Sequence, residues 1–339
     1  MARDDSIDVR PGRLRAMPWE KFKAEVLALY APGQCAAGTA RQMAAALELA
    51  GSVAGEDGEP MVRTTADLTV ALIARIVATR PPEHAPHTTW NLLRKLARAC
   101  NLAVRSGRLR VSPFALKPVK KWVAVPPPAG KRHLSRAELG TLLARLAAEE
   151  GDGRKGWKLW KARRIRAMVA VAAHTGLRAS ELFRLHVEDV DLAARIIHVR
   201  PRGPSGRLKT ANSAAPVPMP AALVPIVEAW LSHRLDPPCF PPPEQVPWLW
   251  PGCRGRGPWT AGPPGAKPLD VLKAVAGRAG IAGVTWQALR RSLATHLEAA
   301  GLGGAMIARI LRHTEEVDRK YYRHADADNL RGAVEGFSL

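Results

Sequence analysis

The chain has 339 residues, 47% hydrophobic and 24% charged, which is typical of a globular protein of about two domains and excludes a disordered chain. Its 51 Lys and Arg residues outnumber 30 Asp and Glu residues, and the formal charge of +21 favours a polyanionic partner, first of all nucleic acid. The sequence has no long apolar run, apolar leader, Cys-x-x-Cys pair or glycine-rich nucleotide motif. We therefore expect no membrane association, metal site, cofactor or small-molecule substrate, and a cytoplasmic, nucleoid-associated protein.

The first third of the chain predicts an all-α domain. Residues 1–17 are polar and rich in Arg, which predicts a flexible leader. Apolar residues then recur every three or four positions, and this spacing predicts short helices throughout 18–116. Segment 117–131 is basic and contains three consecutive prolines, which favours an extended interdomain linker. A surface loop within one domain is the alternative.

The remainder of the chain predicts a mixed α/β domain over 132–325. Ser135 and Glu138 have the spacing of a capping box, which predicts a helix start. Residues 195–200 alternate as in a strand, and 215–219 form a second strand that its prolines restrict to a sheet edge. Segment 236–268 is dense in Pro and Gly and predicts a long surface loop, after which the chain becomes helical again.

Four motifs in this domain carry the residues of interest. They are HTGLRASEL at 174–182, Lys209-Thr210 between the predicted strands, QALRRSLATHL at 287–297, and LRH at 311–313 followed by YRH at 322–324. Their order, and the nine residues from His313 to Tyr322, resemble the tyrosine recombinases, also called the phage-integrase family. The resemblance implies a mainly α fold with a small β-sheet. An N-terminal all-α core DNA-binding domain (SAM-like) would precede a mixed α/β catalytic domain.

The resemblance also implies a role for each motif residue. Arg178 and Arg290 correspond to the two arginines that bind the scissile phosphate, and Lys209 to the general acid. His313 matches the second histidine position and Tyr322 the nucleophile. Gln287 stands where the family most often has His; it can donate a hydrogen bond but cannot carry a proton, which implies reduced or retuned chemistry.

The nucleophile has a neighbour that competes for the role. Tyr321 and Tyr322 are adjacent, and consecutive residues on a helix point about 100° apart, so only one can face a phosphate. The Tyr-x-His register favours Tyr322, whereas Tyr321 is expected to be a packing residue.

The implied activity is site-specific DNA recombination or integration. Strands would be cleaved and rejoined through a 3′-phosphotyrosyl intermediate by a homo-tetramer on double-stranded DNA, without a cofactor. The tail 326–339 would pack either on its own domain or on a neighbouring subunit. A catalytically weakened DNA-binding relative and a type IB topoisomerase-like relaxing enzyme are the alternatives.

A second cationic region lies within 154–166, where seven of thirteen residues are Lys or Arg and two are Trp. Clustered cations near a helix start oppose the helix dipole, which favours an anion outside the chain; a solvated helix face is the alternative. We expect contacts with the DNA backbone from this region and from the basic segment before it: Lys120, Lys121, Lys131, Arg154, Lys155, Lys158 and Lys161.

Overall fold

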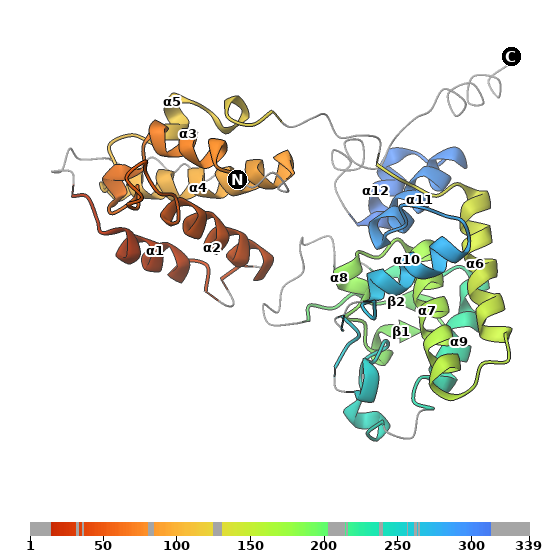
Figure 1. Ribbon diagram of the computed structural model, residues 1–339. Helices are drawn as coiled ribbons and strands as arrows, with labels where there is room; N and C mark the ends of the chain where they lie inside the picture. Colours follow the sequence, from red (N-terminus) through yellow and green to blue (C-terminus); the bar gives the residue numbers. More distant parts are fainter. Residues whose placement is uncertain are drawn as a thin grey trace, which may run out of the picture. The chain divides into compact units, whose positions relative to one another are not determined.

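The computed structural model describes residues 15–31, 34–35, 37–80, 85–124, 131–202, 214, 216–236, 240–255, 257–260, 263 and 265–312. The chain divides into two compact units (Figure 1), Met1–Ala129 and Gly130–Leu339, called here the N-terminal and the C-terminal unit. Most of the predicted leader and the whole predicted tail lie outside the described residues.

The described part of the N-terminal unit is helical. Its helices are α1 (Trp19–Ala28), α2 (Ala37–Gly51), α3 (Val70–Ala78), α4 (Pro86–Arg105) and α5 (Pro113–Leu116), with 3₁₀ turns at Thr65–Asp67 and Val119–Lys121. Helix α2 packs against α1 and α4. Phe22, Leu47 and Leu96 meet in one buried core, because the apolar residues of each helix share one face.

Residues 117–124 depart from the predicted extended linker. The Val123 side chain is buried in the core of the N-terminal unit, and the Trp122 indole N–H donates to the Lys117 carbonyl at 2.9 Å. Two large apolar side chains thus hold this stretch against the N-terminal unit despite its positive charge. The domain bounds assigned from the sequence stay a prediction.

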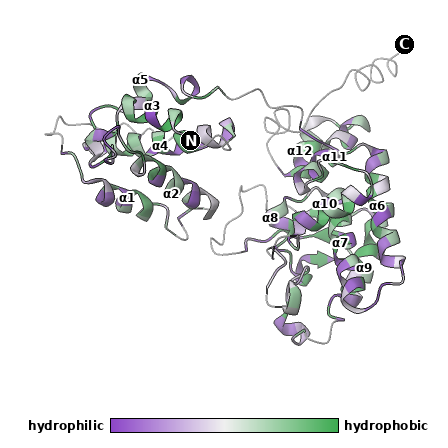
Figure 2. Ribbon diagram, in the orientation of Figure 1, coloured by the Kyte–Doolittle hydropathy of each residue, from purple (hydrophilic) through white to green (hydrophobic). Residues whose placement is uncertain are grey.

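The C-terminal unit is built around one long helix. Its helices are α6 (Arg136–Gly151), α7 (Gly156–Thr175), α8 (Ala179–Leu182), α9 (Val224–His233), α10 (Pro268–Arg278), α11 (Trp286–Ala299) and α12 (Gly304–Leu311). Every residue from Ala167 to Ala173 is buried, because α7 packs against α6, α9 and α11. The hydropathy colouring shows this apolar interior (Figure 2).

A short sheet flanks these helices. Strands β1 (Val190–Asp191), β2 (Ile196–Ile197) and β3 (Val217–Pro218) are antiparallel in the order β1-β2-β3, with Ile197 opposite both Val190 and Val217. The strands predicted near 195–200 and 215–219 are confirmed as β2 and β3, whereas the sequence analysis missed β1. The mainly helical fold with a small sheet is thereby confirmed.

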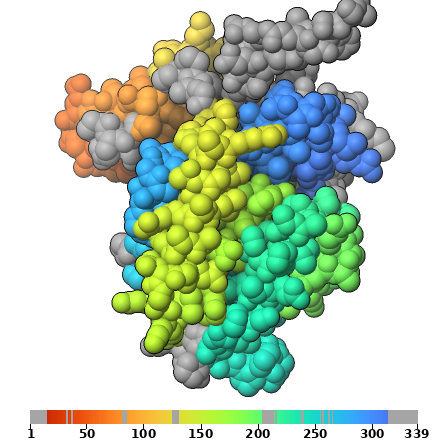
Figure 3. Space-filling model, turned by 90° about the vertical axis from the view of Figure 1, so that its right-hand side faces the viewer, coloured from red at the N-terminus to blue at the C-terminus, as the bar shows by residue number. Residues whose placement is uncertain are grey.

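The start of α6 confirms the predicted capping box. The Ser135 hydroxyl accepts from the Glu138 N–H at 3.1 Å, and the Glu138 carboxylate accepts from the Ser135 N–H at 2.9 Å. The helix then forms a ridge on the surface of its unit, drawn in yellow in Figure 3.

The expectation of a surface loop over 236–268 is wrong for its middle part. Val246, Leu249 and Trp250 are fully buried, and the Trp230 indole N–H donates to the Leu249 carbonyl at 2.8 Å. The prolines prevent a regular helix or strand here, yet the apolar side chains between them are still buried in the core by the hydrophobic effect.

Candidate active site

Gly176 turns the chain from α7 toward the first candidate arginine. Its φ of 61° is left-handed, and its N–H donates to the Ala172 carbonyl at 3.0 Å, which closes the helix. A Cβ at this position would lie 2.5 Å from Leu311 Cδ2. Only glycine satisfies both the backbone angle and this close approach. The turn makes Arg178 the residue that precedes α8.

Arg178 is held by one carboxylate and one helix end. Its N–H donates to Glu181 Oε2 at 3.0 Å, its Nη1 to Glu181 Oε1 at 2.9 Å, and its Nη2 to the Arg312 carbonyl at 3.2 Å. Burial acts to raise the pKa of Glu181, but the charges of Arg312 and Arg178 outweigh it and hold that pKa below its ordinary value. Glu181 is therefore ionised at neutral pH.

Arg290 reaches the same place from α11. Arg290 is fully buried. Its Nη1 donates to the carbonyl of Gly176 at the end of α7, and its Nη2 donates to the carbonyl of Leu311 at the end of α12. The last carbonyls of a helix have no intrahelical partner and carry partial negative charge, so they suit a guanidinium.

The two predicted arginines therefore converge. Arg178 and Arg290 donate to the carbonyls of consecutive residues, Arg312 and Leu311, at the end of α12. Residues that lie far apart in the chain are thus brought to one helix end, immediately before His313. This end of α12 is the candidate active site.

Arg312 is a third guanidinium at this site, and the sequence analysis did not identify it. The residue is 2% exposed, has a left-handed φ of 55°, and donates from Nη2 to Glu181 Oε2 at 2.5 Å. Burial lowers the pKa of Arg312 to about 10, and the Glu181 carboxylate opposes that shift. Nothing in the motif Leu-Arg-His distinguishes this arginine from the many exposed ones.

Of the other predicted catalytic residues, the structure describes Gln287 alone. Gln287 is exposed in the first turn of α11, one turn before Arg290. Arg291, the neighbour of Arg290, instead donates to the Arg132 carbonyl at 3.0 Å. Lys209, His313 and Tyr322 lie outside the described residues.

His296, in the same motif as Arg290, belongs to the scaffold. Its Nε2 donates to the Leu134 carbonyl at 3.0 Å, and burial lowers the pKa of its ring. The neutral imidazole thereby ties α11 to the segment that leads into α6.

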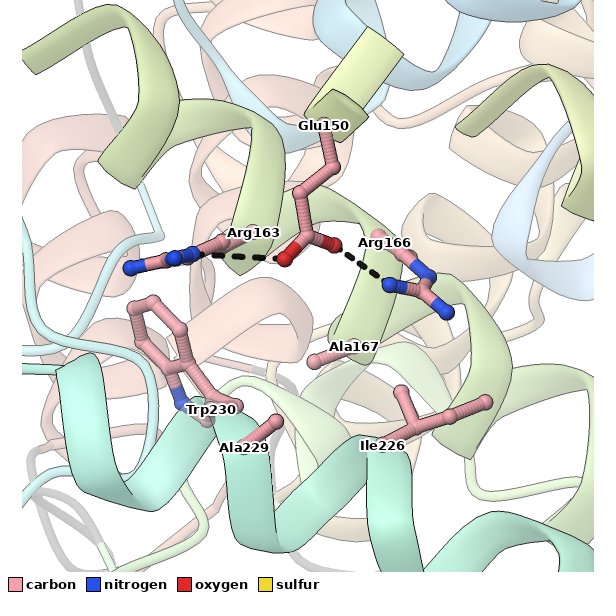
Figure 4. A pocket seen from close by; sticks show the side chains of 7 residues that line it. All are labelled: Glu150, Arg163, Arg166, Ala167, Ile226, Ala229 and Trp230. Carbon is pink, nitrogen blue, oxygen red and sulfur yellow. Dashed lines mark hydrogen bonds and ion pairs between the residues drawn. The ribbon is translucent and has the colours of Figure 1, made fainter. Parts of the chain in front are cut away.

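The cationic region 154–166 is only partly available to an external anion. Arg163 and Arg166 flank the Glu150 carboxylate at 3.2 and 2.5 Å in a small pocket beside Trp230 (Figure 4). The Arg164 guanidinium is buried 3.6 Å from the centre of the Trp259 ring.

The exposed cations of this region are three lysines. Arg154 pairs with Glu149 at 3.3 Å, whereas Lys155, Lys158 and Lys161 are exposed near the start of α7. The available charge therefore comes from lysines rather than from the buried or paired arginines.

Two further findings concern the described residues alone. They contain no cluster of three or more His, Cys, Asp or Glu side chains that could hold a metal ion. None of their helices has both the length and the apolar character needed to cross a membrane.

Comparisons with known proteins place the chain in a family. Residues 159–329 match the phage integrase family. The tyrosine recombinase XerA of Pyrococcus furiosus is 30% identical over 176 residues, which cover 52% of this chain and 55% of XerA. The chain thus matches about half the length of this curated relative.

Two solved structures share the fold. The Tn1549 transposon integrase, in complex with a circular intermediate DNA, has a TM-score of 0.71 and 18% identity, with 95% of this chain and 100% of that chain covered. A lambda integrase dimer bound to a COC′ core site has a TM-score of 0.62 and 13% identity, with 92% and 80% covered. The family match spans half of the chain and includes both converging arginines, so this chain belongs to the phage integrase family, the tyrosine recombinases.

Proposed function

We propose that the chain is a site-specific DNA recombinase that cleaves and rejoins DNA strands through a 3′-phosphotyrosyl intermediate. The observation that carries the proposal is the convergence of Arg178 and Arg290 on the end of α12. Family membership and the excess of 21 positive charges support the same function.

Two converging guanidiniums suit a phosphodiester. The phosphodiester is an anion, and attack by an oxygen nucleophile builds more charge on its non-bridging oxygens. Guanidiniums stay charged at any working pH and present planar donor pairs that match phosphate oxygens. Donors fixed before the reaction stabilise the developing charge most, and the loss of one typically lowers the rate by about 10²–10³-fold.

The remaining chemistry is assigned through the motif positions. The Tyr322 oxygen attacks the phosphorus and forms the phosphotyrosyl bond, while the bond from phosphorus to the 5′ oxygen breaks. Lys209 donates the proton that the leaving 5′ oxygen needs. A 5′-hydroxyl from a second strand then attacks the phosphotyrosyl bond and returns the Tyr322 oxygen. Because the bond energy is conserved, the cycle needs no nucleotide.

His313 and Gln287 complete the proposed site as hydrogen-bond donors to the phosphate. Gln287 has no titratable proton, so the proton transfer rests on Lys209. This assignment gives the chain a working but slower site than one with His at position 287.

Exposed lysines near the start of α7 supply a DNA-backbone contact. Lys155 precedes the helix, and Lys158 and Lys161 follow in its first turns. Cations at a helix N-terminus oppose the dipole, and an external phosphate would relieve that repulsion. The proposed contact set extends to the partly exposed Arg154 and Lys131 and to the exposed Lys120 and Lys121.

Helix α4 offers a face that could read bases. Its 20 residues include no Asp or Glu, and Arg94, Arg98, Asn101 and Arg105 are exposed at steps of three or four residues. Arg pairs with guanine edges and Asn with adenine edges in the major groove. The face therefore combines phosphate affinity with the side chains that discriminate bases.

Strand exchange between two duplexes cuts four strands, and each cut uses one tyrosine. The proposed assembly is therefore four chains on two DNA sites. The tail 326–339 is proposed to pack on its own unit or on a neighbouring subunit.

The test uses nicked duplexes that tile the DNA on both sides of the gene for this chain. The nick lets the short 5′-hydroxyl fragment leave, so a covalent protein–DNA adduct accumulates. Wild-type protein and Tyr321→Phe should form the adduct, whereas Tyr322→Phe should bind the same duplex without forming it. Tyr321→Phe is the matched control because it removes the adjacent hydroxyl.

Three results would contradict the proposal. Binding without an adduct in the wild type would reduce the chain to a DNA-binding relative. An adduct that forms with Tyr322→Phe but not with Tyr321→Phe would identify Tyr321 as the nucleophile. Relaxation of a supercoiled plasmid without a recombination site would indicate a type IB topoisomerase.

A further inference from the structure

Arg312 combines two features that proteins ordinarily avoid. Its backbone is left-handed, with φ 55° and ψ 52°, in the position after a helix where glycine is favoured. Its guanidinium is buried, and the Nε and Nη1 atoms have no hydrogen-bond partner among the described residues. Glycine would remove both the backbone strain and the buried charge. The turn itself therefore gives no reason for an arginine at this position, and the reason must lie in the contacts of its side chain.

The contacts of Arg312 lead to Arg178 by two routes. Its side chain donates from Nη2 to Glu181 Oε2 at 2.5 Å, and the other oxygen of that carboxylate accepts from Arg178 Nη1 at 2.9 Å. Its carbonyl accepts directly from Arg178 Nη2 at 3.2 Å. The Arg312 side chain thus binds the Glu181 carboxylate, which in turn binds the Arg178 guanidinium. The Arg312 carbonyl also contacts that guanidinium directly.

The position of Glu181 depends on having both arginines. Its carboxylate is buried, contacts two guanidiniums through separate oxygens, and also accepts from the Arg178 N–H at 3.0 Å. Among the described residues, removal of Arg312 would leave Glu181 Oε2 with the Arg178 backbone N–H as its remaining hydrogen-bond donor. The carboxylate could then rotate, and the Arg178 guanidinium could rotate with it.

We propose that Arg312 is a positioning residue for strand cleavage. It orients the Glu181 carboxylate, which thereby fixes the orientation in which the Arg178 guanidinium meets the scissile phosphate. The inference rests on the proposed recombinase function. Arg312 contacts neither the nucleophile nor the leaving group in this role, and its effect passes through Glu181 and Arg178.

The test compares Arg312→Gly, Arg312→Lys, Glu181→Gln and the double variant Arg312→Gly/Glu181→Gln with the wild type. Arg309→Ala is the matched control, because Arg309 is an exposed arginine on the same helix. The measurements are the thermal unfolding midpoint, the duplex Kd, and the single-turnover rate of adduct formation at saturating protein.

Arg312→Gly relieves the left-handed backbone but removes one partner of a buried ion pair, so its unfolding midpoint is measured first. At a temperature where it is folded, it should bind duplex DNA normally, yet form the adduct about 10–100-fold more slowly, as for other groups that orient a functional side chain. Arg312→Lys keeps the positive charge beside Glu181 and should recover part of the rate. The double variant should be no slower than the slower single variant, because both changes remove one shared contact. Arg309→Ala should cleave at the wild-type rate.

Several results would overturn the inference. They are a wild-type rate for Arg312→Gly, a loss of rate that only follows a loss of folding, or additive losses in the double variant. If the wild type forms no adduct, the proposed function fails, and a crystal structure of Arg312→Gly decides the positioning role separately. An Arg178 side chain that has left Glu181 supports the role, and an unmoved one contradicts it.

Discussion

A single methyl group at Gly176 tests how the site is assembled. Gly176 ends α7, and its carbonyl accepts from Arg290. A Cβ at this position would lie 2.5 Å from Leu311 Cδ2 and 3.0 Å from Leu293 Cδ2, so the Leu311 side chain would have to move and Leu293 would have to give way by a few tenths of an ångström. Gly176→Ala therefore perturbs the side-chain packing where α7, α11 and α12 meet at the candidate active site.

The expected magnitude has two parts. A non-glycine residue at a φ of 61° costs roughly 1–2 kcal/mol. Overpacking against the two leucines adds about 1–3 kcal/mol, because the added carbon must displace well-packed side chains. The total is about 2–5 kcal/mol, a large fraction of the 5–15 kcal/mol by which proteins are ordinarily stable.

Gly280→Ala is the matched control. Gly280 lies in the same unit with a φ of 73°, but a Cβ there meets no atom within 4 Å. Urea unfolding of the full chain should show a loss of roughly 1–2 kcal/mol for this variant, from backbone strain alone. Equal losses in the two variants, or no loss in Gly176→Ala, would refute the close approach of α7, α11 and α12.

Two further predictions concern stability and DNA binding. The hydrogen bond from Arg278 lowers the pKa of the buried Glu149 below its ordinary 4.5, so this stabilisation is present above about pH 4.5 and is lost as the pH falls through the lower, folded-state pKa. Glu149→Gln should lower the free energy of unfolding by about 1.5–3 kcal/mol at pH 7, and thermal melts from pH 7 to 3 should show a weaker acid dependence than the wild type; an unchanged acid dependence contradicts this. Replacing Lys158 and Lys161 with Gln should reduce the slope of log Kd against log salt by about 2, while Arg163→Gln, whose charge is paired with Glu150, should leave the slope unchanged. Equal slopes in all three proteins would remove the lysines from the DNA interface.

Local patterns in the sequence predicted much of the fold. The Ser135 and Glu138 spacing specified the start of α6, because a capping box involves only one turn of chain. The end of α7 follows an equally local rule, because glycine is favoured in the left-handed conformation that Gly176 adopts after the last helical residue. The strands were harder, since β1 has only two residues and its pairing with β2 comes from tertiary context.

Burial in the irregular segment was not visible in the sequence. Pro and Gly between 236 and 268 indicate a loop, but they do not indicate which face of the loop meets the core. Leu249 and Trp250 are buried because the Leu185 and Trp230 segments bond to this stretch. Such contacts depend on residues distant in the chain, so composition alone could not reveal them.

In the candidate site, too, the sequence revealed residues in local motifs but not a residue whose role depends on distant contacts. The motif order identified Arg178 and Arg290, and the structure brings both to the end of α12. Arg312 has no such signal, because its function depends on the distant Glu181 and on a buried helix end. Lys209, His313 and Tyr322 stay predictions that rest on motif register.

In the proposed mechanism, Arg178 neutralises the charge of the scissile phosphate. The most direct test compares Arg178→Ala with the wild type on two nicked duplexes, one with a normal phosphate at the cleaved position and one with an uncharged methylphosphonate. The variant should be slower by about 10²–10³-fold on the phosphate and should recover most of its activity on the neutral substrate. An equal defect on both substrates would contradict the claim.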